Sequence, residues 1–215
     1  GFAAALPRMI DTLIGCALAW FGVSFIFPDW KFRRLPRNIR RSLNAQCEYL
    51  TEVIEQYKNG RNNGLKYRVV RRAAHNNDAD VASLISTLAT EPDFDPTQKS
   101  QAFEFLCLNH TLLSYIAALG AHREKIADQE VLQLLDQALD DIQGALLKDE
   151  VPDLTAQNML NTIRQRLNQN NEEDQKSLIV LQQLSLMLSI LNQLSRLKQS
   201  LSHDRDEKAT ELASL

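Results

Sequence analysis

Three arginines and a histidine share one side of an expected helix in the segment YRVVRRAAHNNDAD, residues 67–80. Spacings of three and four residues bring Arg68, Arg71, Arg72 and His75 onto neighbouring turns. Guanidinium groups match the geometry of carboxylates and phosphates, so this side could attract an organic anion or a lipid headgroup. The same arginines could instead pair with acidic side chains later in the chain, and the overall charge distribution favours that structural interpretation.

That charge distribution is uneven behind a net charge of −3. Residues 1–75 hold 13 Lys and Arg against 5 Asp and Glu, which gives +8. Residues 76–215 hold 11 against 22, which gives −11. The basic part adjoins an apolar opening, as expected for a segment held against anionic phospholipid. Because no recognised nucleic-acid motif accompanies the basic residues, we expect no nucleic-acid partner.

Other residues that could do chemistry do not form a site. The chain has no glycine-rich phosphate loop and no G-x-S-x-G, H-E-x-x-H or C-x-x-C motif. Cys107 and His110 lie three apart, but zinc usually needs three or four ligands, so we interpret them as a buried thiol and a hydrogen-bonded core imidazole. The acidic side of a later helix is interpreted as solvated; it carries Asp136, Asp140 and Asp141. We expect neither an enzyme nor a bound metal or cofactor.

The apolar stretch near the N-terminus determines where the basic residues that follow it lie. Residues 9–27 carry one charge, Asp11, and as a helix they would extend about 28 Å, close to a hydrocarbon core of about 30 Å. Trp30 follows Pro28 and Asp29 and suits an interfacial anchor. Six basic residues lie at this exit: Lys31, Arg33, Arg34, Arg37, Arg40 and Arg41. The positive-inside rule places them in the cytoplasm, where they fix topology and face lipid.

Two other interpretations of the opening are weaker. A secretion signal carries its positive charges before the apolar run and a small-residue cleavage site after it, and here the order is reversed. A buried helix of a large soluble core is the serious alternative, but six basic residues directly after it would be an unusual boundary. The opening GFAAALP is already apolar and lacks an initiator Met, so we expect a C-terminal fragment with preceding spans before Gly1.

One side of the expected span carries small residues, which let helices approach closely in lipid. Spacings of 3, 4 and 3 place them together: Thr12, Gly15, Ala19 and Gly22. We expect this face to pack against other membrane helices. Asp11 is either a functional group on the bundle-facing side or a solvated residue at the helix start.

After Pro36 the pattern is helical throughout, which predicts an all-α protein. Asn38 is expected to cap a helix with an apolar stripe from Ile39 to Tyr57, and further helices are expected over 65–90, from Asp95, from Asp128, over 154–167 and from about Glu173. The last of these has an uncharged stretch, Ser177 to Ser195, which could be a second membrane span. Its amides argue instead for a buried helix in a cytoplasmic bundle, and the tail after it is expected to fray.

Three stretches together carry a family resemblance. They are Arg8-x3-Thr12-x2-Gly15, the exit FPDW, and RRAAHNNDADVASLISTLATEP. In these the chain resembles the fusaric-acid-resistance (FUSC) family of bacterial inner-membrane proteins, in its YccS/YhfK-like branch. The resemblance covers most of the chain and is strongest over residues 6–30 and 67–92. It implies a larger protein with two sets of membrane helices, cytoplasmic helical domains, and export of aromatic carboxylic acids or similar organic anions.

These observations lead to one organisation. Residues 1–30 are expected to hold the last transmembrane helix, with its span at about 9–27, and residues 31–215 a cytoplasmic multi-helix bundle. The chain would be the C-terminal part of an inner-membrane efflux permease in a multi-pass protein. Its expected partners are membrane lipids, the upstream transmembrane helices and further copies of itself. The alternative is a membrane-tethered scaffold or regulatory module without transport activity, which would bind a partner through the heptad seam from Val180 to Leu194.

Overall fold

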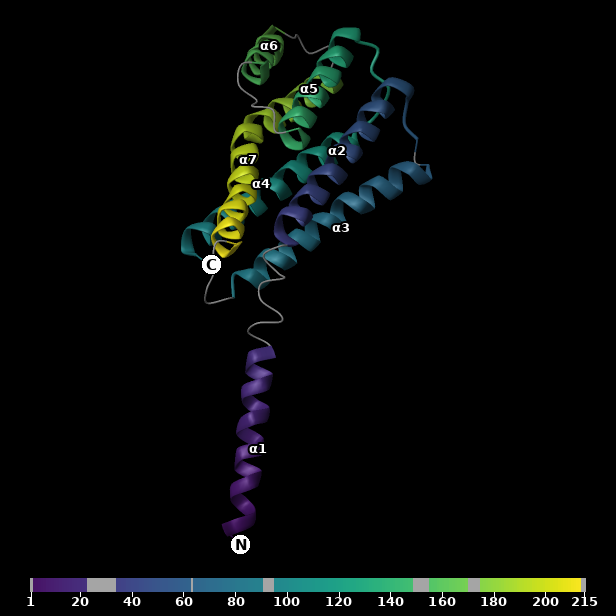
Figure 1. Ribbon diagram of the computed structural model, residues 1–215. Coiled ribbons are helices and arrows are strands. Elements are labelled where there is room, and N and C mark those ends of the chain that lie inside the picture. The colour runs from purple at the N-terminus through teal and green to yellow at the C-terminus, as the bar shows by residue number, and fades with distance from the viewer. Residues whose placement is uncertain are drawn as a thin grey trace. The chain divides into compact units, whose positions relative to one another are not determined.

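The chain folds into helices connected by short segments, as a computed structural model shows (Figure 1). The structure describes residues 2–22, 34–62, 64–90, 95–148, 155–169 and 175–213, and these residues contain helices and no strands. In chain order the helices are α1 (Phe2–Phe21), α2 (Leu35–Asn59), α3 (Leu65–Leu88), α4 (Pro96–Ala121), α5 (Gln129–Leu147), α6 (Thr155–Gln169) and α7 (Gln175–Ala213). The predicted all-α fold class is confirmed.

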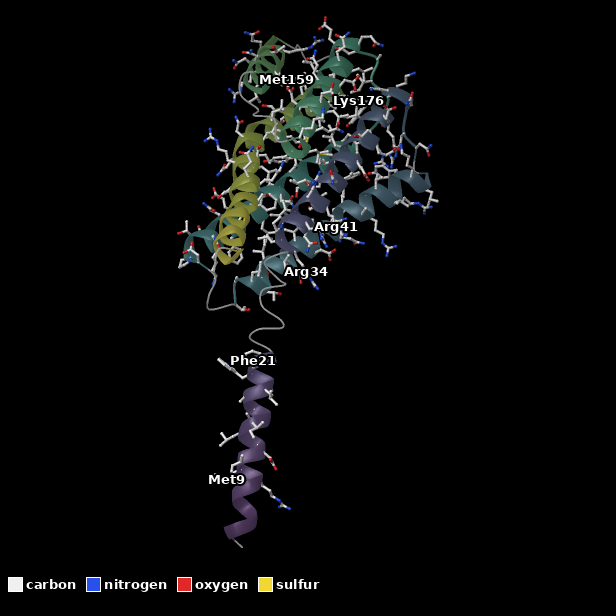
Figure 2. The ribbon with its side chains drawn as sticks, in the orientation of Figure 1. Met9, Phe21, Arg34, Arg41, Met159 and Lys176 are labelled. Atoms are coloured by element: carbon white, nitrogen blue, oxygen red, sulfur yellow. The ribbon has the colours of Figure 1, made fainter. Side chains whose placement is uncertain are left out.

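α1 belongs to a unit of its own, Gly1–Arg34. It begins seven residues before the expected span, and its side chains from Arg8 to Phe21 are exposed. Figure 2 shows them standing off the helix between the labelled Met9 and Phe21. Leu13 is 67%, Leu18 66% and Trp20 69% exposed, and a helix that is apolar on all sides requires an apolar surrounding. Residues 23–33 lie outside the described part, so the end of the span, Trp30, Lys31 and Arg33 are not placed.

The second unit, Leu35–Leu215, is a bundle around α2. α2 begins at Leu35, so the expected cap at Asn38 is wrong. Pro36 fits inside the first turn because its missing N–H has no intrahelical partner there. The expected apolar stripe is confirmed, with every member 3% exposed or less: Ile39, Leu43, Cys47, Leu50, Ile54 and Tyr57. α2 packs against α3, α4, α5 and α7, which places it at the centre of the bundle.

Two predicted helix starts are confirmed in detail. Asp95 caps α4 by accepting hydrogen bonds from the backbone N–H groups of Thr97 and Gln98, both at 3.1 Å. Asp128 caps α5 by accepting from the N–H groups of Glu130 at 2.9 Å and Val131 at 3.3 Å. An aspartate at this position satisfies donors that the helix itself leaves unpaired. Both capped helices pack against α2.

α7 lies along α4, α5 and α6 (Figure 1). α4 and α7 are each long and apolar enough to cross a membrane, over Pro96–Ala121 and Lys176–Ser202, by length and composition. Both bury apolar side chains against their neighbours in the bundle, which is also what core helices do. α7 continues to Ala213, through most of the tail that was expected to fray.

Candidate functional site: an arginine-lined pocket

The structure separates the four residues of the predicted basic cluster. Arg68 and Arg71 line a pocket of about 390 Å³ between α2, α3 and α4, whereas Arg72 and His75 do not line it. All four side chains are exposed. None of the three arginines forms an ion pair with a residue that the structure describes. Pairing with acidic later helices, the interpretation that the charge distribution favoured, is therefore wrong within the described residues.

The pocket is built by residues from three helices and the two segments that flank them. Tyr49 comes from α2, and Tyr67, Arg68 and Arg71 come from α3. Arg61 precedes α3 and Arg123 follows α4. The last three lining residues share one face of α4, at spacings of three and one: Ala117, Gly120 and Ala121. Because these three residues are small, they leave open the space that a longer side chain would fill.

Steric crowding explains why position 120 holds a glycine. A Cβ atom at this position would lie 3.0 Å from the Tyr49 hydroxyl oxygen, 3.2 Å from Cγ2 of Val53 and 3.3 Å from the Tyr67 hydroxyl oxygen. These distances are shorter than ordinary van der Waals contacts. The absence of a side chain therefore allows both tyrosine hydroxyls to lie directly against the α4 backbone.

Arg123 is the fixed cation of the site, and it is only 6% exposed. Its Nε donates to Oε1 of Gln56 at 2.6 Å, and one terminal nitrogen donates to the Tyr67 hydroxyl at 2.9 Å and to the carbonyl of Gly120. Its guanidinium carbon lies 3.7 Å from the centroid of the Tyr67 ring. Hydrogen bonds and the cation–π contact together hold this guanidinium in one orientation.

The two tyrosines of the pocket contact each other through their hydroxyl groups and their rings. Their hydroxyl oxygens are 3.2 Å apart, and their rings are tilted by 60° with centroids 5.8 Å apart. Burial and the hydrogen bond to Tyr67 raise the pKa of Tyr49, and the positive charges of Arg71 and Arg123 only partly oppose this. Tyr49 is therefore neutral near pH 7, and the formal charge of the site comes from its arginines.

A second layer of polar contacts supports Arg123. The Gln56 amide that accepts from Arg123 also donates through Nε2 to Glu52 at 3.2 Å. Lys66 forms an ion pair with the same carboxylate at 2.6 Å and covers it from α3. The backbone N–H of Asn62 donates to Gln56 Oε1 at 3.1 Å. Gln56 thus connects the pocket to α2, to α3 and to the turn between them.

Sequence reasoning missed Arg123, Tyr49 and Gly120. Arg123 is a single cation after the end of α4, in the segment GAHREK, and its spacing signals nothing. Tyr49 lies on the central helix without a polar pattern around it. The YIAALGA run before Arg123 contained the one available signal, because it places small residues on one face of a helix near a glycine.

A second polar cluster lies inside the bundle between α2, α3 and α4. Asp78 is 7% exposed, and its Oδ1 accepts from Nδ2 of Asn109 at 2.7 Å, while its Oδ2 lies 2.8 Å from Nδ1 of His110. Asn109 Nδ2 also donates to the Ser42 hydroxyl at 3.1 Å, and Gln46 donates to the Asn109 carbonyl at 3.2 Å. His110, which was expected to be a hydrogen-bonded core imidazole, is hydrogen-bonded, but its side chain is 67% exposed. The expected buried thiol is wrong, because Cys107 is exposed.

The remaining predicted residues fall outside the pocket. On α1 the Thr12 hydroxyl donates to the Arg8 carbonyl at 2.8 Å. Cβ atoms added at Gly15 and Gly22 would meet nothing within 4 Å, so the small face remains open to a neighbouring helix. Four of the six basic exit residues are described and exposed: Arg34, Arg37, Arg40 and Arg41. The labels in Figure 2 mark the first and last of these near the start of α2.

The acidic side of α5 is only partly solvated. Asp140 is exposed, but Asp136 and Asp141 are half-buried. Asp136 pairs with Lys58 of α2 at 2.8 Å, and the hydrogen bond raises the pKa of that lysine. Burial and the neighbouring Asp140 raise the pKa of Asp141. Asp136 therefore links α5 to α2, whereas Asp141 lies where a negative charge is disfavoured.

Comparison with known proteins shows which proteins this chain is similar to. It is 45% identical over 203 residues to the inner membrane protein YccS of Escherichia coli K12, a match that covers 94% of this chain and 28% of YccS. It is 40% identical over 134 residues to an uncharacterized protein of Haemophilus influenzae, covering 62% of this chain and 19% of that protein. The E. coli protein YhfK matches at 35% identity over 51 residues, which is 24% of this chain and 7% of YhfK.

The chain thus spans less than a third of the length of these curated relatives. No family model matches it. No solved structure matches it. Similarity to YccS over nearly the whole chain supports a membrane protein of the bacterial inner membrane, and both E. coli proteins whose names the expected branch carries are among the matches.

Proposed function

We propose that the chain is the C-terminal part of an inner-membrane efflux permease of the fusaric-acid-resistance family, which exports aromatic carboxylic acids or similar organic anions. The observation that carries the proposal is the exposed apolar surface of α1, in a chain that is similar to an inner membrane protein. A helix with such a surface is stable in lipid, where its backbone groups are paired and its side chains match the surrounding hydrocarbon. The bundle from α2 to α7 then lies in the cytoplasm.

In this proposal each part of the chain has a role in the larger protein. The face of Thr12, Gly15, Ala19 and Gly22 packs against upstream membrane helices, because small residues allow close helix approach. Asp11 lies on the same side as an ionisable group within the membrane bundle. The basic residues at the start of α2 contact anionic lipid and hold the bundle on the cytoplasmic side. Copies of the whole protein associate as a homo-oligomer.

The test is export by the full-length protein in inverted inner-membrane vesicles, with radiolabelled benzoate as the aromatic carboxylate. Vesicles that contain the protein should accumulate benzoate above vesicles from a deletion strain. Asp11→Asn should reduce the initial rate several-fold at equal expression, while Asp80→Asn, an exposed position on α3, serves as the matched control. Equal accumulation in both kinds of vesicle would remove the export function. Unchanged export with Asp11→Asn would remove Asp11 from the mechanism.

The alternative function, a scaffold module, depends on a binding surface that is buried in this structure. The seam of α7 that would bind a partner is buried inside the bundle, with every member 1% exposed or less: Val180, Leu184, Met187, Leu191 and Leu194. A partner could reach it only by displacing α4, α5 or α6. We therefore keep the permease as the proposed function.

A further inference from the structure

We propose that the pocket between α2, α3 and α4 binds a small phosphate-bearing ligand, with Arg68 and Arg71 contacting the phosphate. The site lies in the bundle and takes a different chemical class from the exported anion. It goes beyond the proposed export function, which depends on α1 and on the helices that would precede it. Binding at this pocket would give the bundle a ligand of its own.

Charge is the first argument. Among the residues that the structure describes, four guanidinium groups and no acidic side chain line the pocket: Arg61, Arg68, Arg71 and Arg123. Glu124 forms an ion pair with Lys176, and this pair is the main cause of the lowered pKa of Glu124. Arg61 also lies close enough to Glu124 to contribute to that lowered pKa. A monocarboxylate would bring one negative charge to this set. A phosphate monoester brings about 1.5 to 2 near neutral pH and three acceptor oxygens, so it neutralises the pocket better.

Geometry is the second argument. Arg68 and Arg71 are three residues apart on α3, so their side chains project from adjacent turns on one side of the helix. Arg123 is already fixed by Gln56, Tyr67 and the Gly120 carbonyl, so its orientation costs little further entropy on binding. Convergent arginines of this kind bind phosphate oxygens in paired, charge-assisted hydrogen bonds.

The shape of the pocket is the third argument. Its volume of about 390 Å³ lies within the roughly 300–1,000 Å³ of small-molecule sites. Ala117, Gly120 and Ala121 form an apolar floor beside the rings of Tyr49 and Tyr67. Such a floor suits a flat or aliphatic body attached to the phosphate. Two sources share this chemistry: a soluble phosphomonoester, and a phospholipid whose headgroup is itself a phosphomonoester, as in phosphatidic acid.

Isothermal titration calorimetry on the whole chain in dodecyl maltoside micelles tests the proposal. Adenosine 5′-monophosphate is the soluble probe, adenosine its uncharged control, and benzoate the monocarboxylate. Dihexanoyl phosphatidic acid is the lipid probe, with dihexanoyl phosphatidylcholine as its zwitterionic control. The variants are Arg68→Ala and Arg71→Ala. Arg72→Ala is the matched control, because it removes the same charge from an exposed position on the same helix outside the pocket.

We expect saturable binding of one phosphate probe, weakened at least tenfold by Arg68→Ala and by Arg71→Ala and less than twofold by Arg72→Ala. Ala117→Leu, which fills the pocket without changing charge, should weaken it to a similar extent. Binding of the adenosine phosphate identifies a soluble ligand, and binding of phosphatidic acid alone identifies the lipid headgroup. The proposal is overturned by no saturable binding of either phosphate probe, by equal losses with Arg72→Ala, or by benzoate binding as tightly as the phosphates. None of these results depends on the export assay.

Discussion

Asn109 of α4 donates a hydrogen bond through Nδ2 to Oδ1 of Asp78 on α3, at 2.7 Å and across 31 residues of sequence. Both residues are buried, and His110 and Ser42 extend the contact to the surface and to α2. A buried carboxylate is tolerated only where its oxygens are hydrogen-bonded or paired. The contact therefore fixes how α3 and α4 pack, and these two helices supply most of the pocket lining.

Asp78→Ala should lower the free energy of unfolding of the bundle by roughly 2–3 kcal/mol, because it leaves the buried amide of Asn109 without its charged acceptor. Asp78→Asn keeps an acceptor oxygen at the same place and should cost less. The measurement is urea unfolding followed by circular dichroism. Asp80→Ala, an exposed position on the same helix, should stay within about 0.5 kcal/mol. Equal values for Asp78→Ala and Asp80→Ala would mean that the network does not hold α3 against α4.

Gly120→Ala should destabilise the bundle although alanine is the better helix former. Helix propensity alone would stabilise the variant by about 1 kcal/mol. The added Cβ would lie 3.0 Å from the Tyr49 hydroxyl and 3.3 Å from that of Tyr67, and overpacking of this kind costs about 1–3 kcal/mol. Ala118→Gly, at an exposed position of α4, measures the propensity term in the same helix. A higher urea midpoint for Gly120→Ala would show that the tyrosines move away at little cost.

The start of α4 and of α5, with their caps, followed from local patterns in the sequence, whereas the cap expected at Asn38 did not form. Asp95 and Asp128 were predictable because a cap acts on N–H groups two and three residues away. Asp78 was visible too, as a polar residue within the helix expected over 65–90, but its role was not. A buried carboxylate on α3 requires Asn109, whose position depends on how α3 and α4 cross.

The pocket could not be predicted for the same reason. Arg68 and Arg71 stood out through their spacing, but Arg72 has the same spacing and lies outside the pocket. The distinction depends on where the α4 floor lies, and Arg123 joins the site only because α4 ends beside Gln56 and Tyr67. Tertiary packing, not local periodicity, selects the members of the site.

The three cysteines should differ in reactivity according to their surroundings. Cys107 is exposed on α4, and Cys47 is buried in α2, where burial and the neighbouring Glu48 raise the pKa of its thiol to about 12. The thiolate is the reactive form. In a Cys16→Ser background, N-ethylmaleimide at pH 7.5 should therefore modify Cys107 readily and Cys47 at least roughly a hundredfold more slowly, at the rate of bundle opening.

The control for this labelling is the Cys16→Ser/Cys107→Ser double variant, analysed by intact-protein mass spectrometry with and without 6 M guanidinium chloride. It should gain one label only in denaturant. Rapid labelling of the folded double variant would mean that Cys47 is accessible and that α2 is not the central helix of the bundle.

Asp141→Asn should stabilise the bundle in a pH-dependent way. Burial and the neighbouring Asp140 raise the pKa of Asp141 above the ordinary value of 3.8, so the folded state holds this proton to higher pH than the unfolded chain. Stability is therefore lost as pH rises from the ordinary pKa through the raised one, and the penalty is complete above it. The variant should melt at a higher temperature at pH 7, with little difference from the wild type near pH 3.

Asp136→Asn on the same helix is the opposite case. Asp136 pairs with Lys58 at 2.8 Å, so removing its charge should lower stability at pH 7 by up to about 1 kcal/mol, the range of partly exposed ion pairs. Near pH 3 Asp141 approaches its neutral form, so the difference between Asp141→Asn and the wild type should shrink. Thermal melts by circular dichroism at the two pH values measure the four differences. If Asp141→Asn and Asp136→Asn both raised or both lowered the melting temperature at pH 7, net charge would set the stability of α5. The local surroundings of each carboxylate would then not decide it.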